Sequence, residues 1–122
     1  GVAQATFLAM AGLNRLNMPD DTATPIETTD MLPAIAQGAI GIERRAVDEN
    51  AAQALALIND ATTATRLAAE RALLAGLDGS CQTPIAGLAT LHGDQITLKG
   101  EVLRPDGSES LTDQAYPSKQ VS

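Results

Sequence analysis

The chain contains a single cysteine, Cys81, and the residues around it restrict the local fold more than any other stretch. The segment before it, Arg66 to Leu77, has the pattern of a helix. Gly79 is placed to end that helix, because glycine adopts the left-handed conformation at little cost. Pro84 prevents a helix from resuming and favours an extended segment. We therefore predict that Cys81 lies on a short, accessible loop between a helix and a strand.

A further helix is predicted upstream of this segment, from Glu49 to Asn59. Asp48 precedes it and can cap its first amides, and acidic residues in the first turn suit the positive end of a helix. Leu55 and Ile58 stand three residues apart, which is the spacing of an inward face. We expect both side chains to point into a core.

The helix before the cysteine is predicted to begin at a cap formed by Asp60 or Thr62 and to run to about Leu77. Its apolar residues follow helical spacing and are Ala64, Leu67, Ala68, Leu74 and Leu77. Three charged residues, Arg66, Glu70 and Arg71, fall outside most of this stripe. Their pattern predicts a solvated face on which Arg66 and Glu70 form an ion pair four residues apart. In an intact enzyme Arg71 could instead bridge to another domain.

Three strands are predicted after the cysteine. The runs Ile85–His92 and Gln95–Arg104 flank a Gly93-Asp94 pair, which is a strong signal for a hairpin. The sequence from Pro105 to Ser108 marks a second turn, and Glu109 to Tyr116 follows as a candidate third strand. This half of the chain therefore predicts an α+β fold, in which a small antiparallel sheet packs against helices.

The first part of the chain is less regular. Val2 to Ala9 is apolar and is predicted to be a buried strand, although periodicity alone leaves one longer helix open. A short helix is expected from Ala11 to Leu16, followed by a surface loop from Asn17 to Asp30 that is rich in proline, threonine and aspartate. Ala39 to Glu43 has the composition of a strand buried on both faces and entered through a glycine turn.

Composition and charge exclude several functional classes. The net charge is −7 and no basic cluster is present, so nucleic acid is a poor partner. No apolar run approaches the roughly 18 residues of a membrane span. One cysteine rules out an internal disulfide and fits a reducing cytoplasm. Aromatic residues make up only 2% of the chain, which predicts a thin core that needs neighbours.

No metal site is predicted. His92 is the only histidine, and its place beside a predicted turn favours a solvated side chain. The acidic residues of the loop from Asn17 to Asp30 show no ordered ligand spacing, so that loop is interpreted as solvated.

The segment around Cys81 resembles the signature of the porphobilinogen deaminase family, also called hydroxymethylbilane synthases. The signature is matched without a break by Glu70, Arg71, Leu73, Leu77, Gly79, Ser80, Cys81, Thr83, Pro84, Ile85 and Ala86. Ala9–Leu16 and Leu32–Arg44 resemble two other segments of the same family, in the same order and spacing. The resemblance thus covers nearly the whole chain, while the family proteins are much longer.

The resemblance implies a set of site residues. Cys81 would hold a dipyrromethane cofactor through a thioether, and Gln37 and Gly38 would line the cofactor cleft. Arg15 would bind carboxylates of the pyrroles, and Ala9 would form part of the wall. The family condenses four porphobilinogens into hydroxymethylbilane. Its acid/base aspartate corresponds to a position upstream of residue 1, so no catalytic residue is expected here and the chain alone is predicted to be inactive.

The resemblance also implies three domains. Residues 1–33 would end domain 2, residues 34–58 would return to domain 1, and residues 59–122 would form domain 3 with the cofactor cysteine. The first two segments would be strand and helix pieces of α/β domains. The full-length enzyme is expected to be a monomer, whereas exposed strand edges in residues 1–58 would allow the isolated chain to pair with another chain.

Two other classes remain open from the sequence. The chain could be a non-enzymatic α+β interaction module whose cysteine is incidental. It could also be a thiol enzyme of another kind, which requires a group that lowers the pKa of the thiol. Only Arg71 and Lys99 are candidates for that role.

Overall fold

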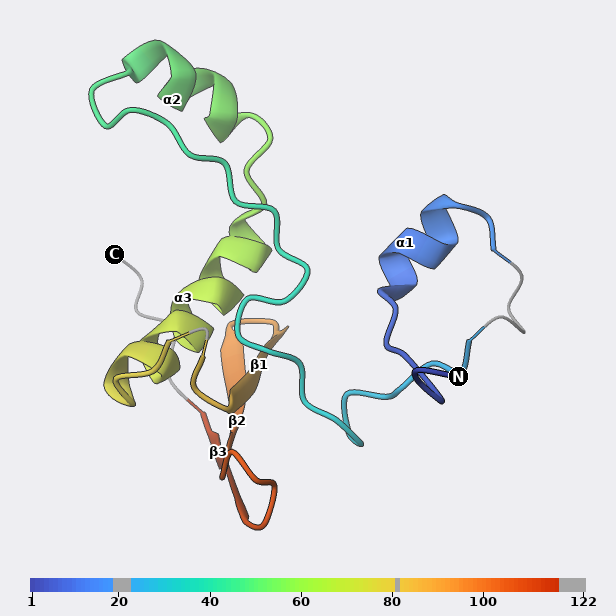
Figure 1. The fold of residues 1–122 in the computed structure, drawn as a ribbon. Helices are drawn as coiled ribbons and strands as arrows, with labels where there is room; N and C mark the ends of the chain where they lie inside the picture. The colour runs from blue at the N-terminus through green and yellow to red at the C-terminus, as the bar shows by residue number, and fades with distance from the viewer. Residues whose placement is uncertain (19–22, 81, 117–122) are drawn as a thin grey trace. The chain divides into compact units, whose positions relative to one another are not determined.

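The computed structural model describes residues 1–18, 23–80 and 82–116 (Figure 1). The chain divides into two compact units, Gly1–Met31 and Leu32–Ser122, and each is described by itself. The first unit contains helix α1, and the second contains helices α2 and α3 and strands β1 to β3. None of the described helices is both long and apolar enough to cross a membrane.

The described part of the first unit contains one element, α1 (Met10–Arg15), which confirms the predicted short helix. The predicted strand from Val2 to Ala9 is wrong: this stretch has no ladder partner, and Phe7 is 76% exposed. A strand needs a neighbour to pair its backbone amides and carbonyls. The described part of this unit supplies no second strand, so the apolar stretch remains irregular.

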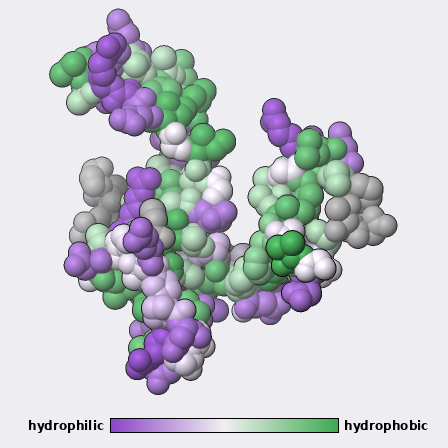
Figure 2. Space-filling model, in the orientation of Figure 1, coloured by the Kyte–Doolittle hydropathy of each residue, from purple (hydrophilic) through white to green (hydrophobic). Residues whose placement is uncertain are grey.

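The second unit begins with residues that do not form the predicted strand at Ala39–Glu43. This stretch has no ladder partner, and Ile40 is 92% exposed. An isolated bridge between Ala34 and Ala86, and not a ladder, links the preceding residues to the sheet. The expected burial on both faces is therefore wrong. Exposed apolar residues are not confined to this stretch, since Figure 2 shows apolar surface in both units.

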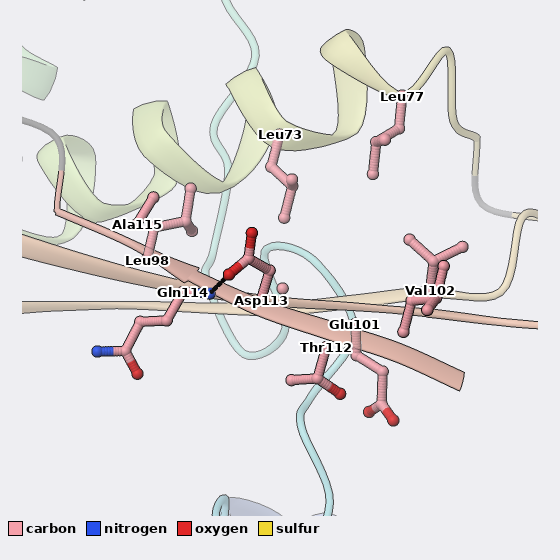
Figure 3. A pocket seen from close by; sticks show the side chains of 11 residues that line it. Leu73, Leu77, Leu98, Glu101, Val102, Thr112, Asp113, Gln114 and Ala115 are labelled. Carbon is pink, nitrogen blue, oxygen red and sulfur yellow. Dashed lines mark hydrogen bonds between the residues drawn. The ribbon is translucent and has the colours of Figure 1, made fainter. Parts of the chain in front are cut away.

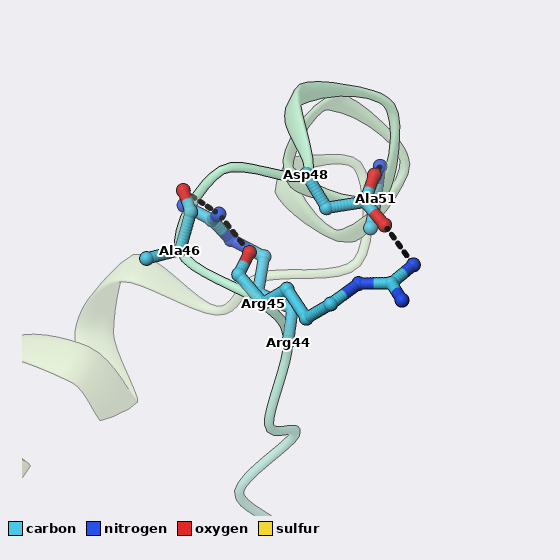
Figure 4. A network of polar contacts seen from close by, with 5 residues as sticks. All are labelled: Arg44, Arg45, Ala46, Asp48 and Ala51. Atoms are coloured by element: carbon cyan, nitrogen blue, oxygen red, sulfur yellow. Dashed lines mark hydrogen bonds and ion pairs between the residues drawn. The ribbon is translucent and has the colours of Figure 1, made fainter.

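Helix α2 (Glu49–Ala56) begins where the sequence predicts. The Asp48 carboxylate accepts a hydrogen bond from the Ala51 amide at 3.0 Å and also pairs with Arg45 at 3.4 Å (Figure 4). The helix ends before Ile58, which is 69% exposed. The predicted inward face is therefore wrong at Ile58, because that residue no longer lies on the helix.

Helix α3 (Ala61–Gly76) is capped by Asp60, which settles the choice between Asp60 and Thr62. The Asp60 carboxylate accepts a hydrogen bond from the Thr63 amide at 2.6 Å. Hydrogen bonds from the side chain and the amide of Thr63 lower the pKa of Asp60 from its ordinary value of 3.8.

The inward face of α3 differs from the predicted apolar stripe. Ala64 and Ala68 are exposed, whereas Arg66 is half-buried and Glu70 is buried. The less exposed positions recur three, four and seven residues apart and include Thr63, Arg66, Leu67, Glu70, Leu73 and Leu74. The side of the helix that faces the sheet therefore includes two charged residues.

The sheet has the predicted hairpin and third strand. Strands β1 (Ile85–His92), β2 (Gln95–Leu103) and β3 (Ser110–Ala115) form one antiparallel sheet in the order β1-β2-β3. Ile85 pairs with Val102, and Val102 pairs in turn with Leu111. The sheet therefore confirms the predicted α+β architecture.

The second turn of the sheet is held locally. Asp106 accepts hydrogen bonds from the amide of Ser108 at 3.0 Å and from its hydroxyl at 2.7 Å. These bonds lower the pKa of Asp106 from its ordinary value of 3.8. His92 is exposed at the end of β1, as predicted.

The core lies between α3, β1 and the start of the second unit. Its buried apolar residues are Leu32, Ile85, Ala89 and Ile96. Helix α3 contacts β1 extensively and β2 at its margin. Every residue of β3 is exposed. One helix thus covers one side of the sheet, and the third strand extends beyond it.

Candidate functional site

The connection between α3 and β1 is the loop on which the sequence places the cysteine. Cys81 itself lies outside the described residues. Its neighbours form a tight turn, in which the Thr83 hydroxyl accepts from the Ser80 amide at 2.9 Å and the Thr83 amide donates to the Ser80 carbonyl at 3.0 Å. The Ser80 hydroxyl also accepts from the Gln82 amide at 3.3 Å. Short side chains on both sides of position 81 therefore satisfy the local backbone.

Gly79 is required at this loop for a different reason from the one predicted. The left-handed residue after α3 is Asp78, with a φ of 50°, and not Gly79. A Cβ on Gly79 would lie 2.6 Å from Leu74 Cδ1 and 2.7 Å from Ile85 Cδ1. The expectation that Gly79 supplies a positive φ is thus wrong. Glycine leaves room there for the side-chain ends of Leu74 and Ile85, which an added Cβ would force to shift.

Glu70 joins three parts of the second unit. It is 5% exposed, and its carboxylate accepts from the Ala36 amide at 2.8 Å and from the Ala89 amide at 2.9 Å. The predicted solvated ion pair with Arg66 does not form. A buried carboxylate needs such donors, because an unpaired charge in the interior is very costly. Glu70 therefore attaches α3 both to β1 and to the turn that precedes Gln37.

Gln37 and Gly38 lie in a fixed turn against the outer edge of β1. The Gln37 amide donates to the Ala34 carbonyl at 3.1 Å, and the Ala39 amide donates to the Ala36 carbonyl at 3.3 Å. Ala36 and Gly38 have φ angles of 61° and 78°. A positive φ is unusual for alanine, and the hydrogen bond from its amide to Glu70 holds it there.

This turn and α3 enclose a pocket of about 180 Å³. Gln37 and Gly38 line one side of it, and Thr63, Arg66 and Glu70 line the helix side. The Arg66 Nε is enclosed by protein and has no hydrogen-bond partner. The structure therefore brings two of the predicted site residues together with an arginine that the sequence assigned to solvent.

Ala9 and Arg15 belong to the first unit. Ala9 is the N-cap of α1, where its carbonyl accepts from the amides of Gly12 and Leu13. Arg15 is exposed in the last turn, where a positive charge suits the negative end of the helix. Gln37, Gly38 and the residues around position 81 belong to the second unit. The structure therefore places the predicted site residues in two separately described units.

An apolar groove lies between α3 and strands β2 and β3 (Figure 3). It has a volume of about 530 Å³. Leu73 and Leu77 point from α3 toward the sheet, and Asp113 points from β3 to the same side. The strands add further apolar side chains, among them Leu98, Val102 and Leu111. The only acidic side chain that Figure 3 shows on the helix side of the groove is that of Asp113, so this groove suits apolar contact better than polar chemistry.

Metal binding finds no support in the described part of the chain. No three histidine, cysteine, aspartate or glutamate side chains among residues 1–18, 23–80 and 82–116 are grouped to hold an ion.

Sequence reasoning missed the roles of Arg66 and Glu70. A signal for them was present, because Thr63, Leu67, Glu70 and Leu74 recur at the spacing of one helix face. The apolar residues alone defined the predicted stripe, so its charged members were assigned to solvent. The amides that pair with Glu70 come from Ala36 and Ala89, and no local pattern identifies such distant donors.

Comparison with known proteins covers both units. The family model described as "Porphobilinogen deaminase, dipyromethane cofactor binding domain" matches residues 1–53. The model described as "Porphobilinogen deaminase, C-terminal domain" matches residues 64–121. The first match includes Ala9, Arg15, Gln37 and Gly38, and the second includes Cys81.

Curated relatives carry the same name. A porphobilinogen deaminase of Paracoccus denitrificans is 63% identical over 111 residues, which are 91% of this chain and 36% of the relative. One of Nitrobacter hamburgensis is 47% identical over 110 residues, covering 90% of this chain and 35% of the relative. A chloroplastic one of Pisum sativum is 49% identical over 112 residues, covering 91% and 30%. The chain belongs to the porphobilinogen deaminase family and spans about a third of the length of these relatives.

Proposed function

We propose that this chain is the cofactor-anchoring portion of a transferase that condenses four porphobilinogens into hydroxymethylbilane. The observation that carries the proposal is the unbroken signature around Cys81, which lies in the connection between α3 and β1. The relatives named above support it, because all three are porphobilinogen deaminases. Residues 1–33, 34–58 and 59–122 are proposed to belong to domains 2, 1 and 3 of the whole enzyme.

Cys81 is proposed to anchor a dipyrromethane. A thiolate is a suitable nucleophile for the methylene carbon of porphobilinogen: a carbon–sulfur bond forms, the carbon–nitrogen bond breaks, and ammonia leaves. The residues present fit this role, because Gly79 and Ser80 add little bulk beside position 81. When bound, the dipyrromethane would supply the pyrrole end to which further units are added.

The other proposed residues bind and position. Arg15 is proposed to bind a carboxylate of the pyrroles, because a guanidinium pairs with both oxygens of a carboxylate. Gln37 and Gly38 are proposed to line the cleft, and their turn is fixed by Glu70. Ala9 is proposed to form wall beside Arg15. The acid/base aspartate is proposed to lie in the part of the enzyme that corresponds to a position upstream of residue 1.

The proposed function also implies a substrate, an oligomeric state and a cellular compartment for the whole enzyme. The proposed substrate is porphobilinogen, and the whole enzyme is proposed to be a cytoplasmic monomer, in keeping with the single cysteine. The isolated chain is proposed to pair with other chains through exposed strand edges. Residues 1–58 were expected to offer them, but the described part of that segment forms no ladder strand, whereas β3 lies at an edge of the sheet.

A chimera tests the proposal. The matching segment of the Paracoccus denitrificans relative is replaced by this chain, and hydroxymethylbilane is measured by chromatography. We expect an active chimera whose peptide containing Cys81 is heavier by two porphobilinogens less two ammonias. The Cys81→Ser chimera should carry no adduct and form no product, and the isolated chain should form none. An active chimera with an unmodified Cys81 would refute the proposal.

A further inference from the structure

Arg66 has a buried donor that the second unit does not use. Its Nε is enclosed and unpaired, although it belongs to a group that is always charged. A buried donor without a partner is costly, and more so when it is charged. Such groups are few in native proteins, and each one needs an explanation. The position of Arg66 therefore points to a missing acceptor.

The nearest carboxylate does not supply that acceptor. Glu70 lies one turn along the same helix face, but its two oxygens accept from the amides of Ala36 and Ala89. Breaking either bond would leave a backbone amide unpaired in the interior. Glu70 is thus committed to the fold, and Arg66 remains available to a ligand.

The pocket in front of Arg66 has the size of a small acidic group. Its volume of about 180 Å³ exceeds the space that a single bound water needs. Leu67 and Leu88 add apolar surface, and Gln37 and Gly38 form the opposite wall. An arm with a short alkyl part and a terminal carboxylate fits both kinds of surface.

We propose that Arg66 binds the carboxylate of one acetate or propionate arm of the pyrrole substrate beside the Gln37–Gly38 turn. This inference rests on the proposed function, because it uses the carboxylates of porphobilinogen. The guanidinium pairs with the carboxylate, and the alkyl part of the arm contacts Leu67 and Leu88. Arg66 is thereby a binding residue and takes no part in proton transfer.

The test follows the Nε–H signal of Arg66 by nuclear magnetic resonance in the full 122-residue chain. Arg66→Lys identifies the signal by its loss. The titrations use a Cys81→Ser background, so that binding is separated from covalent attachment. Porphobilinogen is compared with 2-aminomethylpyrrole, which has the ring and the amine but no carboxylate.

We expect porphobilinogen to shift the Arg66 signal saturably and 2-aminomethylpyrrole to leave it unchanged. Arg66→Lys should weaken porphobilinogen binding about tenfold or more, as loss of a charge-assisted hydrogen bond predicts. Arg71→Lys is the matched control, because Arg71 is exposed on the same helix, and it should bind normally.

The inference is overturned if the Arg66 signal stays unmoved at high porphobilinogen while the Ala36 and Ala89 amides remain protected from exchange. It is also overturned if 2-aminomethylpyrrole shifts the signal equally. An unmoved signal would assign the acceptor to an acidic side chain of the rest of the polypeptide. The resonance titrations do not involve Cys81. If they fail while the chimera still carries an adduct on Cys81, the Arg66 inference is wrong and the proposed function stands.

Discussion

Two apolar stretches of eight residues reach opposite outcomes. Val2–Ala9 and Ile85–His92 are both predicted to be strands, yet only the second becomes one. Ile85–His92 pairs with β2 along its whole length, and its outer edge meets Pro33, Ala34 and Glu70. Val2–Ala9 has no such neighbour among the described residues of its unit. Composition makes a strand possible, and hydrogen-bonding neighbours decide whether it forms.

The largest effect is expected from Glu70→Ala, which removes the acceptor for the Ala36 and Ala89 amides. Two buried donors are left unpaired, so we expect a loss of roughly 3 kcal/mol in unfolding free energy, measured by urea denaturation. Amide exchange at Ala89 should then approach that of Val2–Ala9. Glu70→Gln keeps one acceptor oxygen and should lose less. Unchanged protection of Ala89 in Glu70→Ala would contradict the role of Glu70.

Gly79→Ala should have the next largest effect. The added Cβ would lie too close to the side-chain ends of Leu74 and Ile85, so these side chains must shift and repack between α3 and the start of β1. We expect a loss of about 1–3 kcal/mol, as overpacked sites show, measured by thermal or urea unfolding. Gly76→Ala is the matched control. Nothing lies within 4 Å of its added Cβ. The unfolding free energy should rise by up to about 1 kcal/mol, because Gly76 belongs to the last turn of α3 and alanine loses less backbone entropy there than glycine. Equal effects of the two substitutions would rule out the close approach.

A smaller effect is expected from acid at the cap of α3. Hydrogen bonds from Thr63 lower the pKa of Asp60 below 3.8 in the folded chain. The cap therefore stabilises the helix fully above pH 3.8 and loses this contribution as the pH falls through the lowered value. Circular dichroism should show α3 weakening over that range. Asp60→Asn also caps but does not titrate, so this part of the pH dependence should disappear. Persistence of the same acid transition in Asp60→Asn would assign it to other carboxylates.

The smallest effect is expected from Arg45→Ala. Its contact with Asp48 is 3.4 Å long, and the arginine side chain is 85% exposed. Exposed pairs contribute about 0–1 kcal/mol, so urea unfolding should change by less than about 0.5 kcal/mol. Exchange at Ala89 should not change. A loss comparable to that of Glu70→Ala would mean that surface charge near α2, and not the edge of β1, limits stability.

Local signals predicted the elements that depend on local chemistry. The caps at Asp48 and Asp60 and the hairpin around Gly93 were all readable because each arises within a few residues. Elements that depend on distant partners were not readable. The predicted strand at Ala39–Glu43 failed because no neighbouring strand pairs with it among the described residues.

The candidate site was predicted in part for the same reason. Gln37 and Gly38 lie together in a pocket, but their turn is fixed by a carboxylate more than 30 residues away in sequence. The helix face that bears Arg66 and Glu70 was misassigned, since charge was taken as a mark of exposure. The relation of Arg15 to Gln37 and the placement of Cys81 stay predictions.

The outer edge of β1 has a consequence for self-association. Three alternate amides along it, those of Ile85, Gly87 and Ala89, donate to the Thr83 carbonyl, the Pro33 carbonyl and Glu70. An incoming strand would find these donors taken and could pair only with the opposite side of the sheet, at β3. When β3 of one copy pairs with β3 of a second copy, neither sheet keeps a free edge, whereas a fibre needs a sheet with two free edges. Strand addition should therefore stop at a dimer and not propagate into a filament.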